Sequence, residues 1–228
     1  MNLIIDVGNT YAKLAIYGKN KLRRKQIVKV DELNKAVQNL LVDYPSIDKG
    51  IISSVGKLDS NTVNKIKGQI NLHTLSHKSK LPFKNAYKTP KTLGVDRIAL
   101  VCASVRQFPD NNALIIDAGT CITYDFITAN NVYLGGAISP GIRMRYEALN
   151  NLTANLPLLD TKPPRTIVGS STETSIHSGV IYGIVNEIDG VIAEYKSRYK
   201  DLTVILTGGD GKFLSKRLKN SIFANSNF

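Results

Sequence analysis

The sequence predicts an α/β protein built from two similar halves, and the first reason is a phrase that occurs twice. Residues 6–10 read Asp-Val-Gly-Asn-Thr after the apolar run 3–5, and residues 117–120 read Asp-Ala-Gly-Thr after the apolar run 114–116. A short apolar run that ends in a turn signal is typical of a buried strand. β-prone sequence follows each phrase, so each predicts a strand, a glycine turn and a second strand. The two copies begin at positions 6 and 117 of 228, which divides the chain almost in half.

The first half reads as strands followed by alternating helices and strands. The expected strands span 2–7, 11–17, 22–30, 50–55 and 71–75, and the expected helices span 31–42, 59–69 and about 96–107. Asp31 is expected to cap the first helix. Residues 77–93 contain Pro82 and Pro90 and predict an irregular loop.

The second half repeats this order. We expect strands over 113–118, 121–128, 131–138 and 202–207, helices over about 142–152, 172–198 and from 211, and a short final strand. Gly179, Gly183 and Gly190 interrupt the long helix. Each weakens it by about 1 kcal/mol relative to alanine, so close packing against another element is expected to compensate.

Two βββαβα-like halves make a duplicated ribonuclease-H-like fold. We therefore expect an N-terminal lobe over 1–110 and a C-terminal lobe over 111–228, with a nucleotide cleft between them. The polar run 110–112 is the expected boundary.

The composition argues against a nucleic-acid-binding protein, a membrane-spanning protein and a secreted protein. With 30 Lys and Arg against 18 Asp and Glu, the net charge is +12, which would permit nucleic-acid binding. The lysines are scattered, however, and no recognition helix or aromatic platform accompanies them, so a solvated basic surface without a nucleic-acid partner is favoured. No apolar run approaches the ~20 residues that span a bilayer, and no signal peptide is expected. Cys102 and Cys121 lack metal-ligand spacing and fit a reducing cytoplasm.

The repeated phrase also has chemical meaning. Its glycine lets backbone N–H groups approach a phosphate, and the threonine hydroxyl can donate to it. The aspartate at the strand end can hold a cation or its water shell. One copy alone would be an ordinary tight turn, but two copies facing each other would clamp a polyphosphate. The pattern therefore favours a nucleotide-dependent phosphotransferase.

Five segments together resemble the type III pantothenate kinases, which belong to the actin and sugar-kinase superfamily. The resemblance runs from residue 2 to about residue 211. Its segments are 6–10 with Lys13, Gly94-Val95-Asp96-Arg97, 117–120 with Thr123 and Asp125, 135–141, and the adenosine-side turn 207–209. Cys121 departs from the alanine usual in the family and is small and apolar in character.

The resemblance implies ATP-dependent phosphorylation of pantothenate to 4'-phosphopantothenate, the first step towards coenzyme A. The implied cofactors are Mg²⁺ and a monovalent cation, K⁺ or NH₄⁺. It also implies a homodimer with a shared active site. The implied ATP-binding residues are Asp6, Val7, Gly8, Asn9, Thr10, Tyr11, Ala12, Lys13 and Thr120. Those for pantothenate are Tyr87, Gly94, Val95, Asp96, Arg97 and, from the partner subunit, Thr172. Asp6 would hold Mg²⁺ through the ATP phosphates, and Asp117 the monovalent cation.

Asp96 is the candidate catalytic base. A helix N-terminus keeps a carboxylate ionised and able to accept a proton, and Arg97 offers a planar fork for a substrate carboxylate. Without the resemblance, a charged pair at a helix start would be interpreted as a cap. Thr172 has the same alternative, a helix N-cap, which Ser170 or Ser171 could equally provide.

Three other functions remain as alternatives. The chain could be a sugar or acetate kinase of the same superfamily, a non-catalytic regulatory accessory factor, or a basic nucleic-acid-binding module. The accessory factor would be favoured by loss of the carboxylates in the motifs, and both motifs retain them. His73 and His77 are four residues apart, but a solvated pair is favoured over a metal site. No role is assigned to His177.

Overall fold

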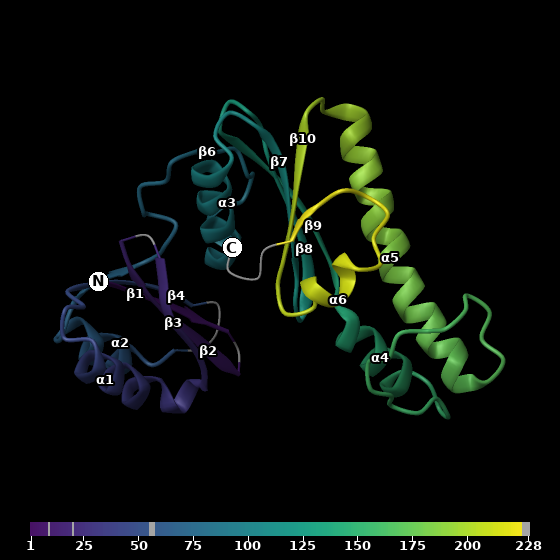
Figure 1. Cartoon of the computed structure of the whole chain (residues 1–228), viewed down its shortest axis with the longest axis horizontal. Coiled ribbons are helices and arrows are strands. Elements are labelled where there is room, and N and C mark those ends of the chain that lie inside the picture. The colour runs from purple at the N-terminus through teal and green to yellow at the C-terminus, as the bar shows by residue number, and fades with distance from the viewer. Residues whose placement is uncertain (9, 20, 55–57, 225–228) are drawn as a thin grey trace. The chain divides into compact units, whose positions relative to one another are not determined.

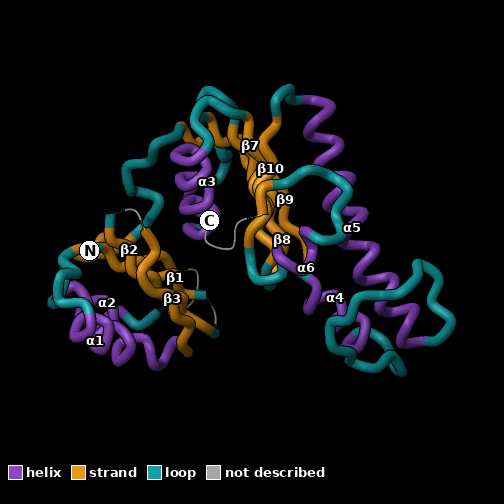
Figure 2. The backbone as a smooth tube through the Cα atoms, viewed as in Figure 1, coloured by secondary structure: helices purple, strands orange, loops and turns teal. Residues whose placement is uncertain are grey.

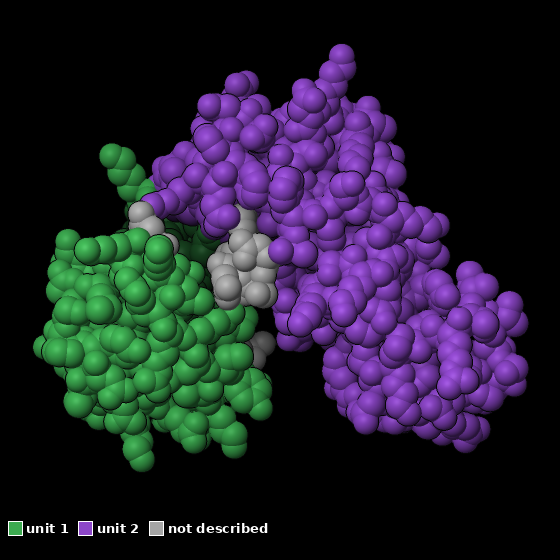
Figure 3. Space-filling view, viewed as in Figure 1, with its two compact units in different colours: residues 1–80, 89–99 green, residues 81–88, 100–228 purple. Residues whose placement is uncertain are grey.

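The computed structural model describes residues 1–8, 10–19, 21–54 and 58–224. The chain forms two compact units, residues 1–80 with 89–99 and residues 81–88 with 100–228 (Figure 3). This division falls inside helix α3 (Val95–Gln107), whereas the sequence places it at residue 110. Residues 81–88 join the second unit because strand β6 (Lys84–Asn85) pairs with β9 (Val132–Pro140).

The first unit is a five-stranded sheet covered by two helices. Its strand order is β3-β2-β1-β4-β5. The strands are β1 (Asn2–Val7), β2 (Tyr11–Gly18), β3 (Lys21–Lys29), β4 (Lys49–Ser54) and β5 (Asn71–Thr74). Helices α1 (Leu33–Asp43) and α2 (Ser60–Lys67) lie together on one side of the sheet (Figure 2).

The core of the first unit fixes which face of the sheet is free. Leu3, Ile5 and Val7 of β1 are buried against α1 residues such as Leu33 and Val37. Successive side chains of a strand point to opposite faces. Asp6 therefore points away from the helical layer.

The second unit is a six-stranded sheet of order β11-β10-β7-β8-β9-β6. Its other strands are β7 (Asn112–Ala118), β8 (Cys121–Ile127), β10 (Leu202–Thr207) and β11 (Phe223–Ala224), and its helices are α4 (Ile142–Asn151), α5 (Thr172–Arg198) and α6 (Gly211–Ser215). Helix α5 runs along the sheet (Figure 1), and its Ile181, Ile184 and Ile188 pack with Leu114 and Ile116 of β7. Asp117 follows Ile116 and so points away from this helical layer.

The two sheets have the same topology. Without β6, the order β9-β8-β7-β10-β11 repeats the order β3-β2-β1-β4-β5 of the first unit. In both sheets the central strand is antiparallel to the strand that follows it and parallel to its other neighbour. The repeated phrase of the sequence is therefore part of a structural duplication, and the predicted ribonuclease-H-like fold is confirmed.

Two local predictions are wrong. Asp31 does not cap the first helix: it lies in a 3-10 turn (Val30–Glu32), and α1 begins at Leu33 after Glu32, without a side-chain cap. The loop predicted over 77–93 contains strand β6, which at two residues is too short to show an alternating pattern.

The expected packing around the α5 glycines is also absent within the described residues. A Cβ atom on Gly179 or Gly190 would meet nothing within 4 Å, and one on Gly183 would meet only Arg145 Nη1 at 3.9 Å. No helix in the described part of the chain is both long and apolar enough to span a bilayer.

Candidate active site

Asp6 lies at the end of β1 between a hydroxyl and an ammonium group. Its register partners are Lys13 on β2 and Ser53 on β4. The Ser53 hydroxyl donates to Asp6 Oδ1 at 3.0 Å, and Lys13 Nζ is 3.8 Å from Asp6 Oδ2. Ser53 is 8% exposed, whereas the side chains of Asp6 and Lys13 are 43% and 55% exposed. The Asp6–Lys13 pair is thus accessible to a ligand, and the buried Ser53 hydroxyl orients the Asp6 carboxylate through its hydrogen bond.

The turn after Asp6 presents its backbone. The Gly8 N–H donates to the Tyr11 carbonyl at 2.9 Å and closes the turn. Thr10 and Tyr11 are exposed, whereas Val7 and Ala12 are fully buried in the core. Val7 and Ala12 therefore hold the two ends of the turn in the core and expose no surface to a phosphate. Asn9, expected to bind ATP, lies outside the described residues.

Asp117 occupies the equivalent position in the second unit. Its register partners are Thr123 on β8 and Thr207 on β10, so it lies between two hydroxyl residues. Side chains directly opposite each other on neighbouring strands lie on the same face of a sheet. Thr123 Oγ1 is buried and has no hydrogen-bond partner among the described residues. A buried hydroxyl and a carboxylate on one face supply the oxygen ligands that hard cations prefer.

The turn 207–209, expected on the adenosine side, passes directly beside Asp117. Gly208 has a φ of +93°, and a Cβ atom there would lie 2.3 Å from the Ala118 carbonyl oxygen and 2.5 Å from Asp117 Oδ1. The Asp210 N–H donates to the Ala118 carbonyl at 2.9 Å. Only glycine permits this approach. The structure therefore brings the second copy of the repeated phrase, residues 117–120, next to the 207–209 turn.

A shallow cavity adjoins this turn. It measures about 360 Å³ and is lined by Gly209, Lys212, Phe213, Lys216 and Arg217. The Arg217 guanidinium lies 3.7 Å from the centre of the Phe213 ring. Three cationic side chains at its rim would attract an anionic ligand.

The segment 135–141 packs against the turn Gly119–Thr120, which is called the second phosphate turn below. The Gly119 N–H donates to the Cys121 carbonyl at 2.9 Å, which leaves Thr120 exposed at the tip. The Gly141 N–H donates to the Thr120 carbonyl at 3.1 Å. A Cβ atom on Gly141 would lie 2.2 Å from the Gly119 carbonyl oxygen, so the two segments are in direct backbone contact.

Asp96 lies in the first turn of α3, as predicted. Its Oδ1 atom accepts a hydrogen bond from the Arg97 N–H at 2.8 Å. Val95 begins the helix, and a Cβ atom on Gly94 would lie 2.3 Å from Asp96 Oδ1. A larger residue at position 94 would therefore force the Asp96 carboxylate to move. The Arg97 side chain is 5% exposed and belongs to the buried part of the first unit.

Tyr87 belongs to the second unit, beside β9. Its N–H donates to Asn85 Oδ1 at 3.0 Å, and its ring centre is 6.1 Å from that of Tyr133. A Cβ atom on Gly135, whose φ is +109°, would lie 3.0 Å from the Tyr87 ring. Gly135 therefore makes room for Tyr87, whereas a Cβ atom on Gly136 would collide with the Tyr124 carbonyl.

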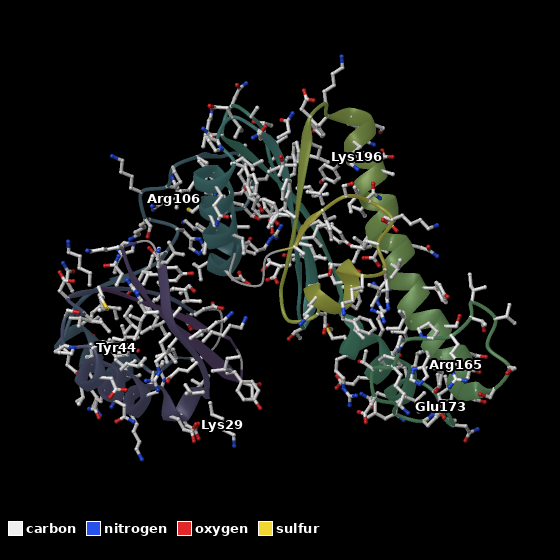
Figure 4. The ribbon with its side chains drawn as sticks, viewed as in Figure 1. Lys29, Tyr44, Arg106, Arg165, Glu173 and Lys196 are labelled. Atoms are coloured by element: carbon white, nitrogen blue, oxygen red, sulfur yellow. The ribbon has the colours of Figure 1, made fainter. Side chains whose placement is uncertain are left out.

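Thr172 is the first residue of α5 and is exposed. The helix is capped by Ser171, whose hydroxyl accepts from the Thr174 N–H at 3.2 Å in a capping box. The interpretation of Thr172 as a plain N-cap is therefore excluded. Figure 4 labels the next residue, Glu173, at this end of α5.

Other polar groups have structural partners. His177 is buried on α5 with its Nδ1 atom 2.7 Å from the Tyr146 hydroxyl. His73 Nε2 is 3.0 Å from Ser79 Oγ. Both cysteines are free thiols, and burial raises the pKa of Cys102 to about 11, which disfavours the reactive thiolate. No three His, Cys, Asp or Glu side chains of the described residues gather as metal ligands.

A duplicated sheet with a strand-end aspartate and a glycine turn in each half defines the class of this protein as the duplicated ribonuclease-H-like fold. A model of the family described as type III pantothenate kinase matches residues 2–194. A type III pantothenate kinase of Christiangramia forsetii is 54% identical to this chain, covering 100% of it and 94% of the relative. One of Flavobacterium johnsoniae is 49% identical, covering 100% and 93%. The chain belongs to the type III pantothenate kinase family.

Solved structures support the fold. A Baf family transcriptional activator from Campylobacter jejuni is similar with a TM-score of 0.64 and 24% identity, covering 98% of this chain and 91% of that one. The ethanolamine utilization protein EutJ from Carboxydothermus hydrogenoformans is similar with a TM-score of 0.52 and 11% identity, covering 97% and 83%.

The sequence did not point to Ser53. Ser53 lies opposite Asp6 on β4, the strand parallel to β1. This position can be recognised only once the strand register is known.

Proposed function

We propose that this chain transfers the γ-phosphoryl group of ATP to the primary hydroxyl of pantothenate and forms 4'-phosphopantothenate, the first step towards coenzyme A. The observation that carries the proposal is the duplicated strand-end aspartate and glycine turn in a chain whose family is that of type III pantothenate kinases. Phosphoryl transfer requires positioned phosphates, an oriented acceptor and compensation of negative charge.

The first unit supplies groups for the ATP phosphates. The exposed Lys13 ammonium can pair with phosphate oxygens, and the exposed Thr10 offers a hydroxyl. Asp6 would hold a phosphate-bound Mg²⁺, which neutralises charge that develops on the phosphoryl group when it is bound. Ser53 keeps the Asp6 carboxylate in place.

Asp96 would accept the proton of the pantothenate hydroxyl, and Arg97 would pair with the pantothenate carboxylate. The position of Asp96 in the first turn of α3 supports this role, because the partial positive charge of a helix N-terminus attracts a carboxylate. We assign Gly94, Val95 and Tyr87 to the same substrate.

Asp117 would bind the monovalent cation, K⁺ or NH₄⁺. Support comes from the buried Thr123 hydroxyl, which lacks a partner among the described residues, and from Thr207 on the other side of Asp117. Both register partners of Asp117 are threonines, so its face of the sheet carries several oxygen atoms of the kind that hard cations prefer.

We also propose a homodimer in which Thr172 completes the pantothenate site of the partner subunit. Thr172 is exposed and does not cap its helix. Ile167 and Val168, shortly before it, are adjacent and are 65% and 77% exposed, so they offer apolar surface that a partner subunit would cover. A cytoplasmic location is proposed as well and is supported by the two free thiols.

An ATP-consumption assay with and without pantothenate, in KCl and then in NaCl, tests the proposal. We expect ATP use that depends on pantothenate and is greater in KCl. A pure protein that consumes no ATP with pantothenate in either salt would contradict the proposal and favour the accessory factor.

A further inference from the structure

An ion pair between α4 and α5 holds the end of strand β9. The Arg145 guanidinium donates to Glu187 Oε2 through Nη2, to the Ser139 hydroxyl at 3.0 Å and, through Nε, to the Pro140 carbonyl at 3.0 Å. The Tyr124 hydroxyl donates to the other oxygen, Glu187 Oε1, at 2.8 Å. Strand β8, strand β9, α4 and α5 therefore meet at one carboxylate.

This cluster is shielded from water. The Arg145 and Glu187 side chains are 22% and 27% exposed, and Tyr124 is 1% exposed. Burial on its own would raise the pKa of Glu187, but hydrogen bonds from Arg145, Ser139 and Tyr124 lower that pKa below its ordinary value. The carboxylate is thus held ionised. Removing either charged partner would leave the other half-buried and uncompensated.

The residues that Arg145 holds lie directly behind the second phosphate turn. Pro140 is the register partner of Cys121, the residue after Thr120. The next residue, Gly141, donates its N–H to the Thr120 carbonyl at 3.1 Å, and the Arg145 N–H donates to the Gly141 carbonyl at 3.2 Å. Because there is no room for even a Cβ atom between Gly141 and the turn, a displacement of Pro140 and Gly141 must displace Thr120.

We propose that Arg145 and Glu187 are positioning residues for the Gly119–Thr120 turn, and that they set the affinity of this turn for the ATP phosphates. The inference rests on the proposed function, in which Thr120 contacts ATP. Arg145 and Glu187 themselves do not touch the nucleotide. Their effect runs through the end of β9, because the arginine binds both the side chain and the backbone of that segment.

The test is a comparison of Michaelis constants for Glu187→Gln and Arg145→Met, with unfolding midpoints measured on the same preparations. We expect the KM for ATP to rise about tenfold or more, because small displacements of positioning groups carry large kinetic penalties. The KM for pantothenate should change by less than about threefold. Arg145→Lys, which keeps the charge but loses the planar fork, should give an intermediate KM for ATP.

Glu194→Gln and Arg198→Met are matched controls. Glu194 and Arg198 also form an arginine–glutamate pair on α5, but their side chains are 60% and 67% exposed, and among the described residues neither side chain has a hydrogen bond to β9. Both controls should keep wild-type constants for both substrates.

Two results would overturn the inference. One is an unchanged KM for ATP in Glu187→Gln and Arg145→Met. The other is a parallel rise in both Michaelis constants together with a lower unfolding midpoint, which would indicate only a structural role. A wild-type protein without pantothenate-dependent ATP use would instead reject the proposed function, so the two failures are distinguishable.

Discussion

Asp6 and Asp117 occupy the same position in two copies of one sheet but have different neighbours. Asp6 lies between Lys13 and Ser53, and Asp117 lies between Thr123 and Thr207. The lysine gives Asp6 an internal cation, so the pair presents both charges to a ligand. The two hydroxyl residues beside Asp117 supply further oxygen atoms of the kind that hard cations prefer, which supports the proposed cation there. The duplication thus supplied two similar sites whose neighbouring residues support different roles.

Asp117→Asn should remove the dependence on a monovalent cation, because the amide keeps the shape of the carboxylate but not its charge. The wild-type rate in K⁺ or NH₄⁺ should exceed the rate in Na⁺, and the variant should have nearly the same low rate in all three salts. Initial rates at fixed ATP and pantothenate measure this. Asp160→Asn, at a carboxylate that is 97% exposed, should keep the wild-type dependence. Full wild-type activity in Na⁺ alone would rule out the role.

Asp96→Asn should lower kcat by roughly 10²–10⁴-fold and leave ATP binding largely intact. The asparagine oxygen can still accept the bond from the Arg97 N–H, so the start of α3 should persist while proton acceptance is lost. Steady-state kinetics together with direct nucleotide binding test this. Asp31→Asn, on an exposed 3-10 turn, is the control. Near wild-type kcat in Asp96→Asn would disprove the assignment of the base.

At the scale of elements, helix α5 contributes to the core, to the candidate site and to the Arg145 cluster of the second unit. Its buried face covers the sheet, its N-terminus carries Thr172, and its Glu187 binds the arginine behind the phosphate turn. Its glycines are not explained by contacts within the described chain, since Gly179 and Gly190 face open space. A helix can carry such glycines only at a cost in stability, unless a second copy of the chain packs there.

Gly190→Ala should therefore stabilise the isolated chain by about 1 kcal/mol, through the higher helix propensity of alanine. Gly208→Ala should do the opposite, because its Cβ would collide with the Ala118 carbonyl and its φ is positive. Chemical denaturation of both variants gives the two free energies of unfolding. A destabilised Gly190→Ala would mean that another element packs on this face.

At the scale of the whole molecule, the proposed site requires two copies of the chain. Asp96 belongs to the first unit and Thr172 to the second, and Ile167 and Val168, close to Thr172 in the sequence, are exposed. A shared site has a consequence that a self-sufficient monomer lacks, namely complementation between two inactive variants.

Asp96→Asn mixed with Thr172→Arg should regain activity after subunit exchange, although each variant alone is inactive. A mixed dimer contains one site with both lesions and one with neither. When half of the dimers are mixed, about a quarter of full activity should return. The rate is measured after exchange has been verified. Persistent inactivity of the mixture, or an active monomer at assay concentration, would contradict the shared site.

The sequence alone determined the features that depend on local chemistry. The boundaries of α5 are those predicted, residues 172–198, because helical apolar spacing and capping residues are properties of neighbouring residues. The repeated aspartate phrases, the strands around them and the helix start at Asp96 were predictable for the same reason, and the family followed from their order.

Tertiary structure alone decided the contacts between distant elements. Ser53 lies opposite Asp6, and Thr207 opposite Asp117, because of strand register, which no single strand encodes. The pair Arg145–Glu187 joins residues 42 positions apart, and β6 forms only because β9 offers it an edge. Periodicity and capping act over a few residues, whereas register and helix contacts are selected by packing of the whole unit. The candidate site residues were therefore predictable from the sequence, whereas their neighbours across the sheet and between helices were not.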